Sequence, residues 1–145
     1  MRKYITKDFY SVVTKLFVII PFIALSACAS QPTASEIANA DYGAYPAEYE
    51  RIVKGFLQRV LKDPSSAQLR KIKGPHSQWS SYFGAAKFGY AVCYGVNAKN
   101  SFGGYTGEKT HYFLIRNGSV VQHMSQRGGD YDIEGTATQK RCYGS

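Results

Sequence analysis

The chain has 145 residues, of which 18 are lysine or arginine and 10 are aspartate or glutamate, so its formal charge is +8. This length fits one domain of ordinary size. Aromatic residues make up 14% of the chain, which excludes low-complexity disorder, and a single apolar stretch excludes a polytopic membrane protein.

The N-terminal segment has the pattern of a secretion signal. An apolar run over 16–25, interrupted by Pro21, follows four basic residues, Arg2, Lys3, Lys7 and Lys15. As a helix, this run is only about 15 Å long, which is half of a bilayer core. A charged start, a short apolar middle and small residues behind it indicate an exported protein rather than a membrane-spanning helix.

Residues 25–28, Leu-Ser-Ala-Cys, resemble the lipobox of bacterial lipoproteins. The resemblance implies cleavage of a signal peptide over 1–27, which leaves Cys28 as the first residue, carrying fatty acyl chains such as palmitate. Ala29 follows the cysteine instead of an aspartate, which in such lipoproteins implies the outer membrane, with the domain in the periplasm. The alternative is an ordinary signal peptide that ends near a cysteine.

The cysteine count agrees with a lipid on Cys28. Three cysteines leave one unpaired in an exported protein, but without Cys28 the pair Cys93 and Cys142 remains. A disulfide between them closes a loop of about 50 residues and stabilises the fold by roughly 4 kcal/mol. Two buried free thiols are the alternative.

The mature chain has 14 basic and 9 acidic side chains, a net charge of +5.

The mature chain divides into a tether and one domain. Residues 28–44 hold the lipidated cysteine and a flexible segment rich in alanine, serine, glutamine and proline, and 45–145 form the domain. Pro46 opens a helix that Asp63-Pro64 ends. Its apolar residues follow a period of 3.6 and form one stripe: Tyr49, Ile52, Val53, Phe56, Leu57, Val60 and Leu61.

After this helix the pattern predicts strands over 66–73, 88–96, 111–116 and 119–124. Asn117-Gly118 favours a two-residue type I′ turn, which pairs 116 with 119 and 112 with 123. One face of that hairpin then carries Phe113, Ile115, Val120 and Met124. We expect an α+β fold in two layers, with one N-terminal amphipathic helix packed on an antiparallel sheet of about four strands.

The segment 98–108 is the longest irregular stretch, and loops of this length are often functional. The sequence Leu-Lys-Asp-Pro-Ser-Ser-Ala at 61–67, together with Val-Asn-Ala-Lys-Asn-Ser-Phe-Gly-Gly-Tyr-Thr-Gly at 96–107, resembles a group of small, uncharacterised bacterial and phage-encoded proteins. The similarity covers roughly 46–124. It implies a common domain and supplies no activity or catalytic residues.

Other motifs lack a residue that their function requires. The acidic segment 130–135 begins like a calcium loop, but Arg141 stands where a bidentate glutamate is needed. The segment 104–110 has the composition of a phosphate-binding loop with the wrong spacing, and 87–94 only partly resembles an RNA-recognition strand. We therefore expect no nucleotide, no nucleic acid and no cofactor.

No catalytic or metal-binding set emerges. The three histidines are His76, His111 and His123, and in the expected hairpin His123 shares its face with Tyr112 while His111 lies on the opposite face, so we expect no metal site. The chain has no G-x-S-x-G elbow and no well-placed pair of acids. We expect a protein that is not an enzyme.

Surface aromatics and the long loop are the remaining candidates for function. The candidate binding loop comprises Asn97, Lys99, Asn100, Phe102, Gly103, Gly104, Tyr105 and Gly107, and a candidate aromatic patch comprises Trp79, Tyr82 and Phe83. These aromatics could equally cap the open end of a small core. We expect an outer-membrane lipoprotein with a non-catalytic binding or scaffolding domain and a protein partner in the cell envelope. The alternatives are an inhibitor of an envelope-attacking hydrolase or a peptidoglycan hydrolase that uses Cys93 or an acid.

Overall fold

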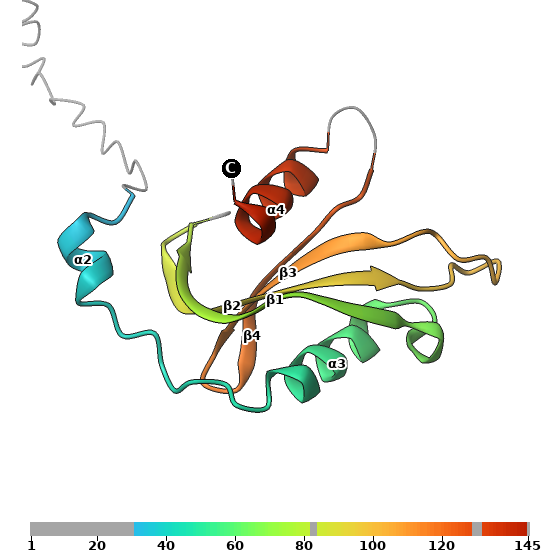
Figure 1. Cartoon of the computed structure of the whole chain (residues 1–145), viewed down its shortest axis with the longest axis horizontal. Coiled ribbons are helices and arrows are strands. Elements are labelled where there is room, and N and C mark those ends of the chain that lie inside the picture. Colours follow the sequence, from blue (N-terminus) through green and yellow to red (C-terminus); the bar gives the residue numbers. More distant parts are fainter. Residues whose placement is uncertain (1–30, 82–83, 129–131, 145) are drawn as a thin grey trace, which may run out of the picture.

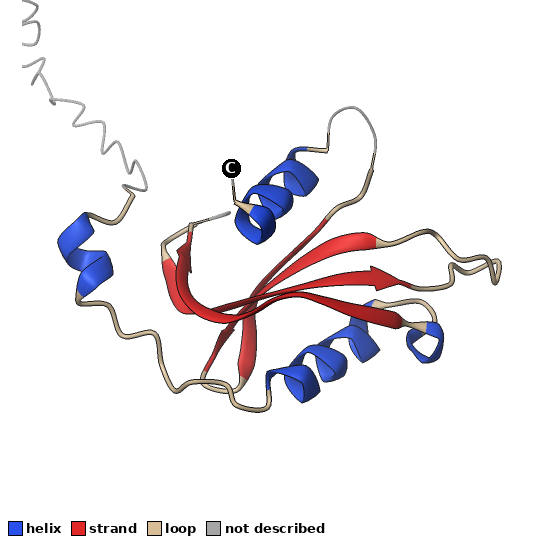
Figure 2. Ribbon diagram, viewed as in Figure 1, coloured by secondary structure: helices blue, strands red, loops and turns tan. Residues whose placement is uncertain are grey.

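The structure is a computed structural model that describes residues 31–81, 84–128 and 132–144. The expected signal peptide and Cys28 lie outside the described residues. The elements are, in chain order, α2 (Ala34–Ala38), α3 (Tyr49–Val60), the 3₁₀ turn η1 (Pro64–Ser66), β1 (Gln68–Ser80), β2 (Lys87–Asn97), β3 (Lys109–Arg116), β4 (Ser119–Ser125) and α4 (Ile133–Tyr143). Figure 2 shows the strands in red, with helices in blue before and after them in the chain.

The four strands form one antiparallel sheet in the order β1-β2-β3-β4, so each strand pairs with its neighbours in the sequence. The prediction of an α+β fold with a four-stranded antiparallel sheet is confirmed. Figure 1 shows α3 below this sheet and α4 above it.

The helix α3 covers one face of the sheet because its apolar stripe points at the strands. Val53 and Leu57 are buried, and they pack with strand residues of the same face: Val92, Tyr94, Val96, Phe113 and Ile115. The helix is shorter than predicted at both ends, since it begins at Tyr49 rather than at Pro46 and ends at Val60, before Asp63-Pro64. The carboxylate of Asp63 instead caps η1, because it accepts a hydrogen bond from the backbone N–H of Ser66.

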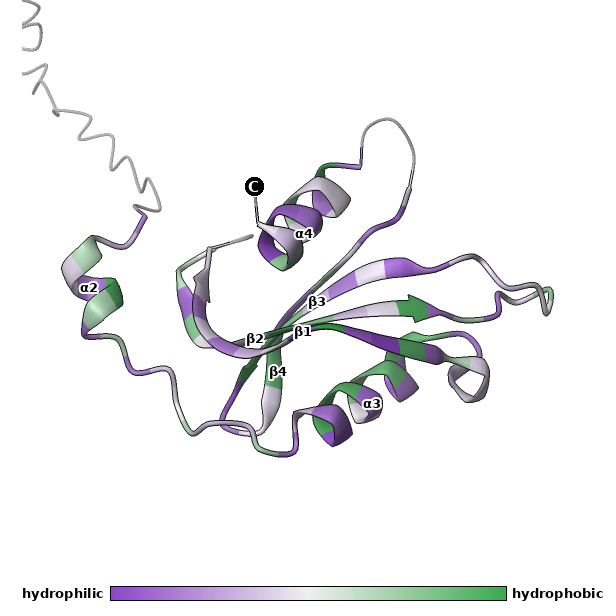
Figure 3. Ribbon diagram, viewed as in Figure 1, coloured by the Kyte–Doolittle hydropathy of each residue, from purple (hydrophilic) through white to green (hydrophobic). Residues whose placement is uncertain are grey.

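The helix α4 covers the opposite face, so the expectation of one N-terminal helix in a two-layer fold is wrong. Cys142 of α4 packs with a second buried cluster made by the other face of the strands: Ala91, Cys93, Tyr112, Leu114 and Met124. Sequence patterning missed α4 because the helix is weakly amphipathic and holds Gly135 and two threonines, which are poor helix formers. In Figure 3 most of α4 is purple or pale.

A disulfide joins Cys93 of β2 to Cys142 of α4, as the cysteine count predicts. Cys93 is fully buried and Cys142 is 3% exposed. The bridge attaches a helix of low hydrophobicity to the centre of the sheet. This covalent link explains how so polar a segment can pack over the second face of the sheet.

The β3–β4 hairpin departs from the expected register after two pairs. Ile115 pairs with Val120 as predicted, but Leu114 pairs with Gln122, so Val121 is an extra residue in β4. Such a bulge moves every later side chain of the strand to the other face. Met124 therefore packs toward α4, not toward α3 as predicted, and His123 takes its place on the α3 face.

The edge strand β1 is longer than predicted. It continues through Gly74-Pro75 to Ser80, with register shifts between Lys71 and Lys73 and between Lys73 and His76. Proline is tolerated in an edge strand with bulges because no ladder hydrogen bond is required of it there.

The segment before α3 is attached to one end of the sheet. Asp41 forms an ion pair with Arg116 at 2.5 Å, and the ring of Tyr42 packs edge-on against Phe88 at 5.7 Å. The chain thus joins the sheet where β2 begins and β3 ends, at the opposite end from the loop that connects these two strands (Figure 1).

Candidate functional site

The loop between β2 and β3, here called the 97–107 loop, is the tip of a hairpin and is held together by hydrogen bonds within the loop. Lys99 pairs with Tyr105 in an isolated antiparallel bridge. Inside it, Asn100 is the central residue, because its side-chain oxygen accepts hydrogen bonds from the N–H groups of Phe102 at 2.9 Å and Gly104 at 3.1 Å. Gly103 has a φ of +81°, a conformation that favours glycine. The loop is therefore pre-organised.

This loop exposes its aromatic residues instead of using them to cap the core. Phe102 is 96% exposed and Tyr105 is 48% exposed. Lys99 lies over the Tyr105 ring at 5.5 Å, a cation–π contact that joins the two strands of the tip. Of the other expected loop residues, Asn97 is the last residue of β2, and Gly107, with a φ of +83°, precedes β3.

The candidate aromatic patch does not adjoin the loop. Trp79 lies in β1 opposite Phe88, whereas the loop starts at Asn97, which pairs with Gln68 at the far end of the same strand pair. Tyr82 and Phe83 lie outside the described residues. The structure thus separates Trp79 from the 97–107 loop by nearly the whole length of β1.

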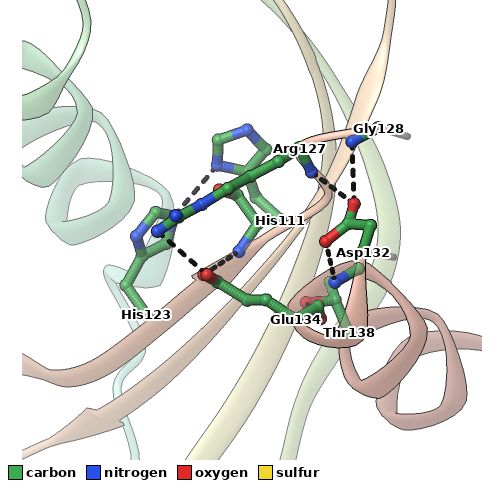
Figure 4. Close-up of polar contacts among 9 residues, drawn as sticks. His111, His123, Arg127, Gly128, Asp132, Glu134 and Thr138 are labelled. Atoms are coloured by element: carbon green, nitrogen blue, oxygen red, sulfur yellow. Dashed lines mark hydrogen bonds and ion pairs between the residues drawn. The ribbon is translucent and has the colours of Figure 1, made fainter. Parts of the chain in front are cut away.

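The bulge in β4 brings together two histidines that the expected register kept apart. His111 Nδ1 and His123 Nε2 are 3.0 Å apart, within hydrogen-bond distance. Figure 4 shows the two rings facing each other from β3 and β4. The prediction that they lie on opposite faces is wrong. The adjacent valines 120 and 121, which break the alternation of a short strand, were the one sequence signal for the bulge.

Aromatic rings hold the histidine pair in place. The His123 ring lies 5.0 Å from that of Phe113 and 4.9 Å from that of Phe56 on α3, and His111 stacks on Phe113 at 6.0 Å. Burial is the main reason that the pKa of His111 falls to about 3 and that of His123 to about 4. The other histidine and Lys109 lower the pKa of His111 further, while Glu134 opposes the shift at His123. Both imidazoles are therefore neutral at pH 7.

The histidine pair lines a cavity of about 340 Å³ beside the 97–107 loop. We call it the histidine–lysine cavity. Its wall is formed by the end of α3 and the residues after it, the end of β2, the two ends of the loop, the start of β3 and the end of β4. The lining residues are Val60, Leu61, Lys62, Val96, Ala98, Lys99, Asn100, Thr106, Lys109, His111, His123, Ser125, Gln126 and Arg127. No pattern in the sequence marks this set, because its members come from four separate segments.

Acidic residues at the start of α4 fix one rim of the cavity. Arg127 forms an ion pair with Glu134 at 3.0 Å, and the same carboxylate accepts a hydrogen bond from the N–H of Ser125 (Figure 4). Asp132, in the segment that resembles a calcium loop, instead accepts three backbone N–H groups, from Arg127, Gly128 and Gly135. These hydrogen bonds lower the pKa of Asp132 and cap α4.

The described residues offer neither a free thiol at Cys93 nor a cluster of metal-ligating side chains. Cys93 offers no nucleophilic thiol, since it is in a disulfide and fully buried. Within 31–81, 84–128 and 132–144, no group of three histidine, cysteine or acidic side chains is close enough to hold a metal ion. Nor does any helix in these ranges have the length and apolar character to cross a membrane.

The chain matches no protein-family model, no curated protein and no solved structure. The resemblance to a group of small bacterial and phage-encoded proteins therefore stays a prediction. Any functional assignment depends on the geometry of the 97–107 loop and the histidine–lysine cavity.

Proposed function

We propose that this chain is an outer-membrane lipoprotein, anchored through Cys28, whose domain binds a partner in the cell envelope without catalysing a reaction. The observation that carries the binding role is the pre-organised 97–107 loop, which presents a 96% exposed Phe102. A large apolar side chain at the tip of a loop that is held by its own hydrogen bonds is typical of an interface anchor, because the loop loses little conformational entropy when it binds.

Export is supported by two independent features. The lipobox-like segment 25–28 follows a charged and apolar leader. The two remaining cysteines form a disulfide, and structural disulfides are typical of oxidising compartments.

The position of the loop suits a protein attached at its N-terminus. The chain joins the sheet at Asp41 and Tyr42, next to Phe88 near the start of β2, and the loop begins at the other end of that strand. At about 3.3 Å per residue, the 11 residues of β2 span roughly 35 Å. A lipid at Cys28 then leaves the loop at the end of the domain that lies away from the attachment point.

Metabolic labelling with radioactive palmitate tests the anchor. We expect label in the full chain and none in the Cys28→Ala variant, which should leave the membrane fraction. Equal labelling of both proteins, or no labelling of either, would contradict the lipid anchor.

Site-specific photo-crosslinking in cells tests the loop. A crosslinking amino acid at Phe102 should give one defined adduct, and the same group at Tyr143, which is 54% exposed on α4, should not. The adduct should weaken in an Asn100→Ala background, because that change frees the loop tip. Adducts of the same pattern from both positions would contradict a binding role of the loop.

A further inference from the structure

The histidine–lysine cavity carries positive charge that carboxylates do not balance. Lys62, Lys99, Lys109 and Arg127 line it, and no carboxylate is among the lining residues. Arg127 is engaged by Glu134. The three lysines form no ion pair with any carboxylate of the described residues. Lys109 Nζ donates one hydrogen bond to the carbonyl of Arg127, and the carboxylate of Asp63 acts on Lys99 from a distance while it accepts hydrogen bonds from Ser65 and Ser66.

The imidazole pair adds an unused hydrogen-bond donor to the same cavity. Each neutral ring carries one N–H, and the contact between His111 Nδ1 and His123 Nε2 uses only one of the two. The second N–H sits on one of the outer nitrogens, His111 Nε2 or His123 Nδ1, and among the described residues the only hydrogen bond of either ring is the one between the two histidines. An acceptor that also carries negative charge can take this hydrogen bond and pair with the neighbouring ammonium groups.

Part of the wall is apolar, and the cavity is small. Val60, Leu61, Val96 and Ala98 line it beside the uncharged polar residues Asn100, Thr106, Ser125 and Gln126. The volume of about 340 Å³ is at the small end of the range for ligand sites. A bare anion would leave this apolar surface uncovered. An anionic group on a small organic body fills both parts.

We propose that the histidine–lysine cavity binds the phosphate group of an organic phosphate ester, with the ammonium groups of Lys62, Lys99 and Lys109 and one imidazole N–H as its donors. A phosphate is preferred to a carboxylate because it carries up to two charges and three acceptor oxygens, which suit several ammonium groups acting as point charges. The ester can be a free metabolite or the headgroup of a lipid. This inference deepens the proposed function, on which it rests for the assumption that this end of the domain binds a ligand.

Ligand binding to the cavity can be followed by the NMR signals of the three histidine side chains. We would record the imidazole ¹⁵N–¹H signals of the full chain in a neutral detergent at pH 7.5, while adding glycerol 3-phosphate. The His111 and His123 signals should shift and saturate, and the His76 signal should stay fixed, because His76 lies on β1 against the carbonyl of Gly74 and outside the cavity. If neither ring shows a saturable shift with glycerol 3-phosphate or with phosphatidylglycerol vesicles, the proposal is overturned.

Matched lysine variants separate a site from general charge attraction. Lys62→Gln should weaken binding about three- to tenfold, the usual effect of one charge-assisted hydrogen bond at an exposed position. Lys54→Gln removes the same charge from the outer side of α3, where the lysine does not line the cavity, and should leave the affinity within about twofold of the wild type. Equal weakening by both substitutions would overturn the proposal.

Further probes identify the source of the phosphate. Vesicles of phosphatidylglycerol, compared with phosphatidylcholine, replace glycerol 3-phosphate in a second titration. Binding that depends on Lys62 supports a free ester in the first case and a lipid headgroup in the second. An equal response to acetate, or a response to Zn²⁺ with none to phosphate, would overturn the assignment. Because these assays use neither palmitate labelling nor the Phe102 crosslink, failure of the cavity and failure of the proposed function are distinguishable.

Discussion

Lowering the pH from 7.5 to 5.0 is expected to destabilise the domain through His111 and His123. Burial keeps both rings neutral by lowering their pKa far below the ordinary value of 6.5 that they regain in the unfolded chain. Below pH 6.5 unfolding therefore takes up protons, so stabilisation that is fully present above this pH is lost as the pH falls.

The size of the effect follows from the linkage between protonation and unfolding. Each histidine contributes about 1.4 kcal/mol per pH unit below 6.5, which gives an upper limit of about 4 kcal/mol for the pair at pH 5.0. Carboxylates with a lowered pKa act in a different window. Glu108 and Asp132 have ordinary values of 4.5 and 3.8, so their stabilising contribution is present at pH 5.0 and is lost only at lower pH.

Urea unfolding at a series of pH values measures this slope. His123→Gln keeps an amide that can hydrogen-bond to His111 but cannot take up the proton, so the loss of stability between pH 7.5 and 5.0 should fall to about half. His76→Gln, on β1, is the matched control and should retain the slope of the wild type. A wild-type loss of less than about 1 kcal/mol, or an unchanged slope in His123→Gln, would refute the buried neutral pair.

Three other predictions follow from single contacts. Reduction of the Cys93–Cys142 disulfide, whose partners are separated by 49 residues, should lower the free energy of unfolding by about 4 kcal/mol in urea titrations, and a loss under about 1 kcal/mol would contradict this. Asn100→Ala removes the acceptor for two backbone N–H groups at the loop tip. Amide exchange at Phe102 should therefore accelerate while global stability changes by less than about 1 kcal/mol, and unchanged exchange would count against the pre-organised loop. Asp132→Ala removes the cap of α4 and should cost about 1 kcal/mol, with faster exchange confined mainly to that helix; a stable, well-protected α4 would contradict the capping role.

Local patterns in the sequence determined the elements that have strong periodicity. The stripe from Tyr49 to Leu61 predicts α3 because a period of 3.6 is a property of one segment alone. The Asn117-Gly118 turn predicts the β3–β4 hairpin and its first two pairs, since this dipeptide suits the positive φ angles that the turn requires. Counting cysteines predicts the pair Cys93 and Cys142 without any knowledge of distance.

Only the tertiary structure decided the second helix and the site. The helix α4 lacks a clear stripe and is held by a disulfide to β2, so its own segment gives little signal. The cavity depends on one extra residue, Val121, which turns His123 toward His111 and places Met124 on the other face. A change of register moves every following side chain across the sheet, and its cost or benefit depends on packing against α3 and α4 rather than on the strand itself. For this reason sequence alone predicts the sheet and the loop, while the folded structure assembles the histidines and lysines into one cavity.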